Sequence, residues 1–233
     1  MEPVLFYGVP QGCSFGSIVA LEWLGQPYRL CRINMPDDMQ NDLYARVNEI
    51  RETPVLLLEN GATLSESAAI LQNIGTRGID RGLGFAQGSA DFDRLNRMLS
   101  YLTTTFFAAF SPLWTAYEMA EDPPVQAMLR ELGRQQVARA HRQLDAMLAG
   151  RDWLVGERCS VADAYFMGIA RWADYHKAID RRDYPNLYRH VQTLERDPAI
   201  DFAHAIEAGR PAISGGGFLG HVALTDLQKR IAA

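Results

Sequence analysis

Short apolar runs alternate with segments of helical periodicity over the first third of the chain. The runs that predict strands are rich in β-branched and aromatic residues, and they cover residues 4–7, 28–33 and 55–59. Between them, residues 14–24 and 37–50 repeat apolar positions at the spacing of a helix. Asn60-Gly61 is the pair most typical of a tight hairpin, so we expect a fourth strand to follow it, and then a helix over residues 65–74.

This order of elements, β-α-β-α-β-β-α, predicts the type of sheet. A strand–helix–strand unit joins two parallel strands through a crossover, whereas a hairpin adds antiparallel strands. The sheet is therefore expected to be mixed and four-stranded, with helices on both faces, which is a thioredoxin-like α/β arrangement. We assign this domain to residues 1–76.

The remainder of the chain is predicted to be helical. Residues 77–90 are glycine-rich and lack periodicity, which is typical of a linker. A second, all-α domain is expected over residues 91–208, with helices at residues 91–110, 124–148, 160–176, 187–196 and 200–208. The Gly-rich residues 209–233 are expected to form a flexible tail, with a short helix over residues 224–231.

Composition and charge exclude several classes of function. The net charge is −5 and no basic stretch occurs, which argues against nucleic-acid binding. No apolar run approaches the roughly 20 residues of a membrane helix, and the N-terminus lacks a secretory signal pattern. Three scattered cysteines do not form a disulfide framework, so we expect a cytoplasmic protein. The five histidines are also scattered, and no metal site is expected.

Three side chains near the first predicted helix are candidates for binding or activating sulfur. Cys13 lies just before this helix, whose N-terminal partial positive charge favours a thiolate, although most free cysteines are simply buried. The Ser14 hydroxyl could hydrogen-bond a substrate thiolate or cap the helix. Tyr7 is a third candidate donor, with a core position as the alternative.

Two further segments are suited to a peptide ligand. Thr53-Pro54 precedes the third strand, and a cis bond there would turn the Thr53 backbone outward, toward a ligand. Ser65, Glu66 and Ser67 open the next helix, where free N–H groups can hold a carboxylate and Glu66 can pair with an ammonium group. Plain helix capping is the alternative for this trio.

The helical domain contributes two more motifs. Ser160 and Asp163 have the spacing of a capping box, which is a structural role. Four aromatic residues, Phe106, Phe107, Phe110 and Trp114, lie near the end of the first long helix, and a pocket wall would be formed near Phe106, Phe110 and Trp114. Their density suits either a core or the wall of an apolar pocket.

Taken in order, these motifs resemble those of the cytosolic glutathione transferases, over roughly residues 3–208. The segments that carry the resemblance are Tyr7 with Cys13-Ser14, and residues 18–22, 24–28, 53–61, 64–67, 69–70 and 160–164. The cysteine after the first strand makes the bacterial, cysteine-containing beta class the most similar. The resemblance implies the glutathione transferase fold, glutathione as co-substrate, a homodimer and a role in detoxification.

The resemblance also implies roles for individual residues. Thr53, before a cis-Pro54, would pair its backbone with the cysteinyl part of glutathione. Glu66 and Ser67 would hold the γ-glutamyl group, and the candidates near the first helix would face the sulfur. The aromatic residues of the first long helix would contact a hydrophobic electrophile.

The sequence departs from the family pattern at several positions. Residues 48–51 read Asn-Glu-Ile-Arg where the family has Asn-Pro-x-Gly, and residues 36–38 read Pro-Asp-Asp where the beta class places a lysine for the glycyl carboxylate. Phe107-Ala108 replaces a basic pair, and one extra residue separates Tyr7 from Cys13.

Two functions follow from this sequence. The first is an enzyme that activates the thiol of glutathione, for attack on a hydrophobic electrophile or for thiol–disulfide exchange through Cys13. The alternative is a non-catalytic adaptor, in which the fold binds a protein partner and the glutathione site has decayed.

Overall fold

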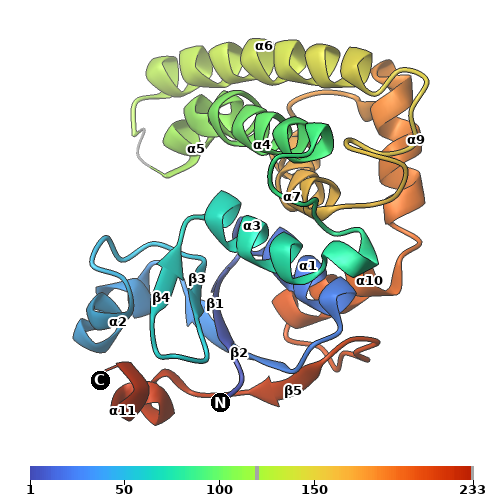
Figure 1. Ribbon diagram of the computed structural model, residues 1–233. Coiled ribbons are helices and arrows are strands. Elements are labelled where there is room, and N and C mark those ends of the chain that lie inside the picture. The colour runs from blue at the N-terminus through green and yellow to red at the C-terminus, as the bar shows by residue number, and fades with distance from the viewer. Residues whose placement is uncertain (119–120, 232–233) are drawn as a thin grey trace.

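The computed structural model describes residues 1–118 and 121–231. A sheet flanked by helices forms the lower part of Figure 1, and an all-helical part lies above it. Within the described residues, five strands pair in the order β4-β3-β1-β2-β5. Their bounds are Val4–Val9 (β1), Tyr28–Asn34 (β2), Val55–Leu57 (β3), Thr63–Ser65 (β4) and Phe218–His221 (β5).

The predicted thioredoxin-like arrangement is confirmed for the first four strands. Strands β1 and β2 are parallel, whereas β3 is antiparallel to β1 and to β4. The helices of this domain are α1 (Phe15–Leu24), α2 (Asp42–Val47) and α3 (Ser67–Arg77). Helix α1 ends at Gly25, whose φ of +65° is typical of a C-terminal glycine cap.

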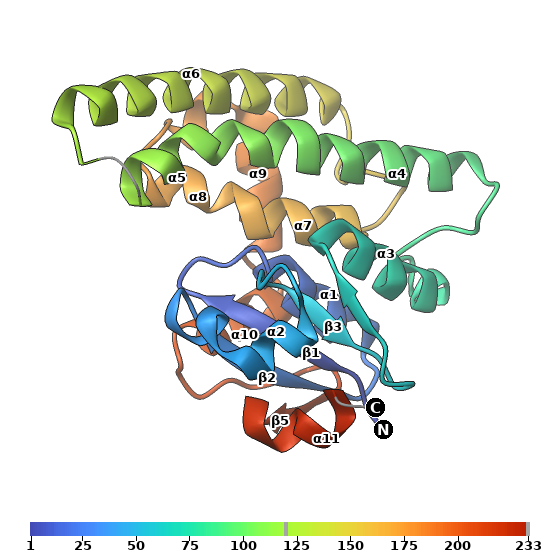
Figure 2. The same ribbon diagram turned by 90° about the vertical axis from the view of Figure 1, so that its left-hand side faces the viewer.

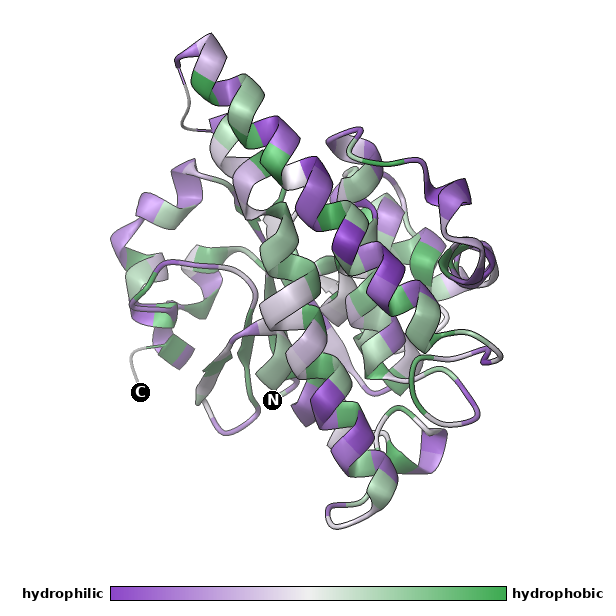
Figure 3. Cartoon of the chain, turned by 90° about the horizontal axis from the view of Figure 1, so that it is seen from above, coloured by the Kyte–Doolittle hydropathy of each residue, from purple (hydrophilic) through white to green (hydrophobic). Residues whose placement is uncertain are grey.

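The second domain is helical, as predicted. Its helices are α4 (Ala90–Tyr101), α5 (Ser111–Glu118), α6 (Pro123–Met147), α7 (Val161–Ala170), α8 (Trp172–Tyr175), α9 (Pro185–Leu194) and α10 (Pro198–Glu207). Seen from above, hydrophobic and hydrophilic residues alternate along the uppermost helix, α6 (Figure 3), as expected for a helix with one buried face. No helix in the described ranges is long and apolar enough to cross a membrane.

Some predicted helices are divided in the structure. The helix expected over residues 91–110 leaves α-geometry after α4, passes through a π-helical segment (Leu102–Phe107) and a 3₁₀ turn (Ala108–Phe110), and continues as α5. The predicted helix over residues 37–50 is a 3₁₀ turn, Asp37–Gln40, followed by α2.

The capping box at the start of α7 is confirmed. The Ser160 side chain accepts a backbone hydrogen bond, and the Asp163 carboxylate accepts the Ser160 N–H at 2.8 Å. Asp163 also accepts the Leu154 N–H at 3.0 Å. Because all three groups are buried, the box fixes the approach of the chain to α7.

The two domains meet where α1 packs against α7, as Figures 1 and 2 both show. A Cβ on Gly16 would lie 2.5 Å from the Ala164 carbonyl oxygen, and one on Gly168 would lie 2.9 Å from the Gly16 nitrogen. Real side chains do not fit at such distances, so the two backbones are in direct contact. This contact holds the N-terminal end of α1 against the second domain.

The sequence predicts a flexible tail over residues 209–233, of which 232–233 lie outside the described residues, and the structure differs over residues 209–231. Strand β5 pairs in parallel with β2, so the described part of the sheet has five strands instead of the predicted four. The carboxylate of Glu22 accepts hydrogen bonds from the Ser214 hydroxyl (2.8 Å) and the Gly216 N–H (2.9 Å). The predicted short helix is present as a 3₁₀ turn, Leu224–Leu227, followed by α11 (Gln228–Ile231).

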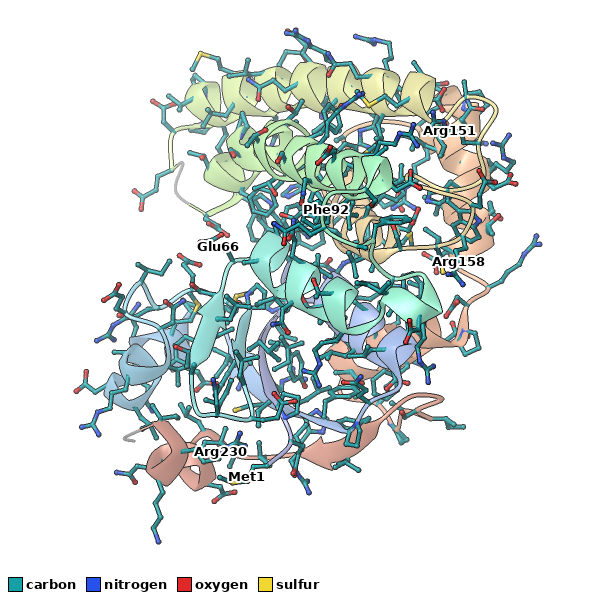
Figure 4. The ribbon with its side chains drawn as sticks, in the orientation of Figure 1. Met1, Glu66, Phe92, Arg151, Arg158 and Arg230 are labelled. Carbon is teal, nitrogen blue, oxygen red and sulfur yellow. The ribbon has the colours of Figure 1, made fainter. Side chains whose placement is uncertain are left out.

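The glycines of this segment permit close packing. A Cβ on Gly216 would lie 2.5 Å from the Glu22 carbonyl oxygen, and one on Gly217 would lie 1.9 Å from the Gln26 carbonyl oxygen. After β5, Leu227 is buried against the face of the sheet that α2 also covers. Arg230 lies beside the N-terminus in Figure 4 and donates to the Glu2 carbonyl oxygen at 3.1 Å.

Replacing Gly217 by Ala is expected to detach β5 from β2. The added methyl group would overlap a backbone atom, and overpacking of this kind costs about 1–3 kcal/mol. Urea denaturation measures the loss in free energy of unfolding. Faster hydrogen exchange at the Tyr28 N–H shows that the loss lies at β5, because this N–H donates to the Gly217 carbonyl oxygen. Gly215→Ala is the control, because nothing in the described part of the chain lies within 4 Å of its added Cβ. Equal stability of the two variants would contradict this packing.

Candidate functional site

A pocket of about 230 Å³ lies between the two domains. The first domain lines it with Cys13, with residues of the segment 48–54 and with the start of α3. The second domain lines it with Thr103, Phe107 and Tyr165. Figure 4 shows Glu66 at the level where the two domains meet.

Cys13 contacts both of the segments predicted to bind a peptide ligand, through Thr53 and Ser67. Its thiol donates to the Thr53 carbonyl oxygen at 3.5 Å and accepts a hydrogen bond from the Ser67 hydroxyl, also at 3.5 Å. The Thr53–Pro54 bond is cis, as the family resemblance implies. Three segments distant in the sequence therefore converge on one sulfur atom.

The electrostatics of this pocket keep Cys13 protonated. Burial raises the pKa of the Cys13 thiol above its ordinary value of 9.0, outweighing the Ser67 hydrogen bond and the charge of Arg171, which both lower it. The charge of Glu52 raises this pKa further. A Cys13 thiolate, one of the two alternatives that the sequence left open, is thus not favoured in the free protein.

Glu66 and Ser67 do not act as simple helix caps. Glu66 occupies the N-cap position of α3, and its side chain forms no capping bond to the described helix. Its φ of +70° lies in a region uncommon for residues other than glycine, and such conformations concentrate at functional sites. The Ser67 hydroxyl points to Cys13, so both side chains remain available to the pocket.

Ser14 and Tyr7 are not brought to this pocket. The Ser14 hydroxyl is buried and accepts the Gly8 N–H at 3.2 Å. The Tyr7 hydroxyl hydrogen-bonds His221 Nε2 at 3.0 Å, and Tyr7 lines a different pocket together with His221 and Arg32. The structure therefore leaves Cys13 as the candidate of the three that faces the pocket.

The predicted aromatic wall is displaced by one residue. Phe106 and Phe110 are fully buried in the second domain, where the Phe106 ring lies 4.7 Å from that of His141. Phe107 faces the pocket instead. Phe106 and Phe107 lie in the π-helical segment Leu102–Phe107, where side chains are spaced differently from those of an α-helix.

Trp114 also lies away from the residues that line the pocket. Its ring stacks on Tyr175 with centroids 5.6 Å apart, and it meets the edge of Trp172 at 5.2 Å. Trp172 in turn contacts Phe107 at 5.1 Å. Trp114 is therefore connected to the pocket residue Phe107 through Trp172.

Arg171 is a positioning residue that the sequence analysis missed. Its guanidinium donates to the Gly12 carbonyl oxygen at 2.7 Å and to Gln11 Oε1 at 3.1 Å. It also forms a bidentate ion pair with Glu207, at 2.6 and 2.8 Å, and both side chains are largely buried. Trp172 Nε1 donates to the Gln11 carbonyl oxygen at 2.9 Å. The second domain thus holds the loop that leads to Cys13.

The charge of the pocket is negative. Glu52 and Glu66 line it, and among the residues that the structure describes no Lys, Arg or His does. The neighbouring Arg51 donates to the Gln40 carbonyl oxygen at 2.6 Å and pairs with Asp42 at 3.3 Å. Arg51 has a φ of +57°, a conformation suited to the glycine that the family places there.

No group of acidic, histidine or cysteine side chains suited to a metal ion occurs within residues 1–118 and 121–231. The pocket therefore offers one thiol, two carboxylates, a hydroxyl at a helix start and backbone groups beside Thr53. These are groups that recognise an amino-acid head group and a neighbouring sulfur.

Two family models match the chain, the glutathione S-transferase N-terminal domain over residues 13–77 and the C-terminal domain over residues 97–198. Glutathione S-transferase GST-4.5 of Xanthomonas campestris is 32% identical over 174 residues, which are 74% of this chain and 82% of that protein. Two solved structures are also similar. A sphingomonad glutathione S-transferase complexed with glutathione matches with a TM-score of 0.77 and 30% identity. The bacterial beta class glutathione S-transferase of Sphingomonas chungbukensis matches with a TM-score of 0.76 and 26% identity. Each of these two structural matches covers 88% of this chain and 98% of the chain in the solved structure.

Alkylation of Cys13 by iodoacetamide is expected to become half-maximal only above pH 9.0, because burial raises the pKa of this thiol. Ser67→Ala should move the midpoint higher, since it removes a hydrogen bond that stabilises the thiolate. Ser65→Ala, which changes a pocket hydroxyl not bonded to Cys13, is the control. Mass spectrometry of the Cys13 peptide follows the reaction. A midpoint near neutral pH would contradict the description of this site.

Proposed function

This chain belongs to the glutathione S-transferase family, and from that premise we propose that it binds glutathione in the pocket around Cys13 and transfers the tripeptide to a hydrophobic electrophile. The observation that carries the proposal is the convergence of Thr53, Ser67 and Cys13 on one point beside Glu66. Of the two functions predicted from the sequence, the named transferases among the relatives support the enzyme.

The γ-glutamyl head group binds at the start of α3. The Glu66 carboxylate pairs with the α-ammonium group, and the Ser67 hydroxyl with the first N–H groups of α3 holds the α-carboxylate. The cysteinyl residue lies beside the Thr53 backbone, which brings its sulfur next to Cys13.

Cys13 acts as a hydrogen-bond donor to the sulfur of glutathione. A thiol with a raised pKa keeps its proton at neutral pH, so it can donate to a neighbouring thiolate as it donates to the Thr53 carbonyl oxygen in the free protein. A donor to the charged form lowers the pKa of the bound glutathione thiol, whose proton passes to solvent.

Transfer then takes place by nucleophilic displacement. The glutathione thiolate forms a carbon–sulfur bond to the electrophile, and the leaving group departs with its electron pair. The electrophile lies against Phe107 and Tyr165, the side chains that the helical domain presents to the pocket. Thiol–disulfide exchange through Cys13 is the slower reaction at neutral pH, because it needs the Cys13 thiolate.

Family membership also supports three broader proposals. The chain forms a homodimer, acts in the cytoplasm and contributes to detoxification of electrophiles. Sedimentation of the purified protein tests the first of these.

Glutathione at millimolar concentration is expected to raise the melting temperature. A ligand at about 100 times its dissociation constant adds roughly 2.7 kcal/mol to the free energy of unfolding. Glu66→Ala should abolish the shift, because it removes the partner of the ammonium group. Glu121→Ala, an exposed carboxylate outside the pocket, should leave the shift unchanged. An unmoved melting temperature in the unsubstituted protein would refute the proposed function, and a full shift in Glu66→Ala would refute the head-group assignment.

Cys13→Ala is expected to separate binding from turnover. The variant should retain the glutathione-induced thermal shift, because its head-group and backbone contacts remain. Its kcat for conjugation of glutathione to 1-chloro-2,4-dinitrobenzene should fall by about tenfold or more, since the thiolate loses its donor. The pH at which the rate is half-maximal should rise in parallel. An unchanged pH profile would exclude a role of Cys13 in ionising the substrate.

A further inference from the structure

The register of the sheet gives the direction in which a peptide would lie in the pocket. Val55 pairs with Ser65 in the antiparallel ladder of β3 and β4, so Pro54 lies opposite Glu66. A peptide with its head group at Glu66 and its next residue beside Thr53 therefore runs antiparallel to the segment before β3. This placement of the peptide rests on the proposed function. The third residue of such a peptide reaches Glu52.

Glu52 makes that end of the pocket negative. Its carboxylate is exposed, lines the pocket and acts on the Cys13 thiol, whose pKa it raises. The neutral donors nearby are already engaged, since the Tyr44 hydroxyl and the Asn48 amide both donate to the Glu52 carbonyl oxygen, at 2.6 and 2.9 Å.

The cation next to Glu52 in the sequence, Arg51, is directed away from the pocket. Arg51 donates to the carbonyl oxygens of Met39 and Gln40 and pairs with Asp42, so its guanidinium is bound on the side of residues 39–42. Within the described residues, the pocket lining has no positive side chain near Glu52.

These charges do not match the charges of free glutathione. At neutral pH the tripeptide carries one ammonium group and two carboxylates. Glu66 and the start of α3 complement the ammonium group and the first carboxylate, but the second carboxylate would face Glu52. Like charges at short range disfavour binding, and a neutral or cationic group in place of that carboxylate removes the repulsion.

We propose that the preferred thiol substrate is a γ-glutamylcysteinyl peptide whose C-terminal carboxylate is an amide, either neutral or extended by a cationic amine. Free glutathione is then the weaker ligand of the same pocket. Glu52 is the residue that determines this specificity.

The test compares two probes that differ by one charge, glutathione and its C-terminal carboxamide, by isothermal titration calorimetry at low ionic strength. The carboxamide is expected to bind about tenfold more tightly or better, and the ratio should shrink as salt is added. Glu52→Gln should bring the two affinities to within about threefold of each other by strengthening the binding of glutathione. Glu49→Gln, an exposed carboxylate outside the pocket lining, should leave the ratio unchanged.

The outcomes separate this inference from the proposed function. If glutathione binds as tightly as the carboxamide or more tightly, the inference is overturned and the proposed function stands. If neither probe binds, the proposed function itself fails. A preference for the carboxamide that persists in Glu52→Gln would also overturn the inference, because Glu52 would not be its source.

Discussion

The backbone contact between α1 and α7 is the constraint on which the rest of the structure depends. Gly16 and Gly168 allow the two helices to approach until no side chain fits between them. The ion pair of Arg171 with Glu207 then fixes the loop before α1, through the carbonyl oxygen of Gly12. Because Cys13 follows that loop directly, the packing of the helical domain sets the position of the sulfur in the first domain.

Burial and charge together determine what this sulfur can do. The same packing that places Cys13 at the pocket partly buries it, and the pKa of its thiol rises for that reason. A protonated thiol is a donor, whereas a nucleophilic cysteine requires the thiolate. The acidic side chains Glu52 and Glu66 act in the same direction, since they favour neutral or positive groups in the pocket. The proposed chemistry and the proposed specificity thus have one electrostatic origin.

The C-terminal segment shows how composition misleads when contacts are unknown. Its glycines predict flexibility. In the structure, the backbone of residues 22–26 lies so close to Gly216 and Gly217 that no side chain would fit at either position. The buried carboxylate of Glu22 anchors this segment to α1. Strand β5 then covers the edge of β2, an edge that would otherwise expose unpaired backbone groups.

The sequence by itself determined the elements whose signals are local. The periodicity, the Asn60-Gly61 pair and the Ser160 capping box predicted the order of strands and helices, and Cys13 was a candidate because it lies just before a helix. These signals are readable because each depends on residues a few positions apart.

Only the tertiary structure decided the features that depend on distant partners. The ion pair of Arg171 joins residues 36 positions apart, and the contact of Cys13 with Ser67 spans 54 positions. Phe107, and not Phe106, lines the pocket, and both residues lie in a π-helical segment that the sequence pattern did not predict. The pKa of the Cys13 thiol is raised chiefly by burial, a property of the whole fold that the residues next to Cys13 in the sequence do not reveal.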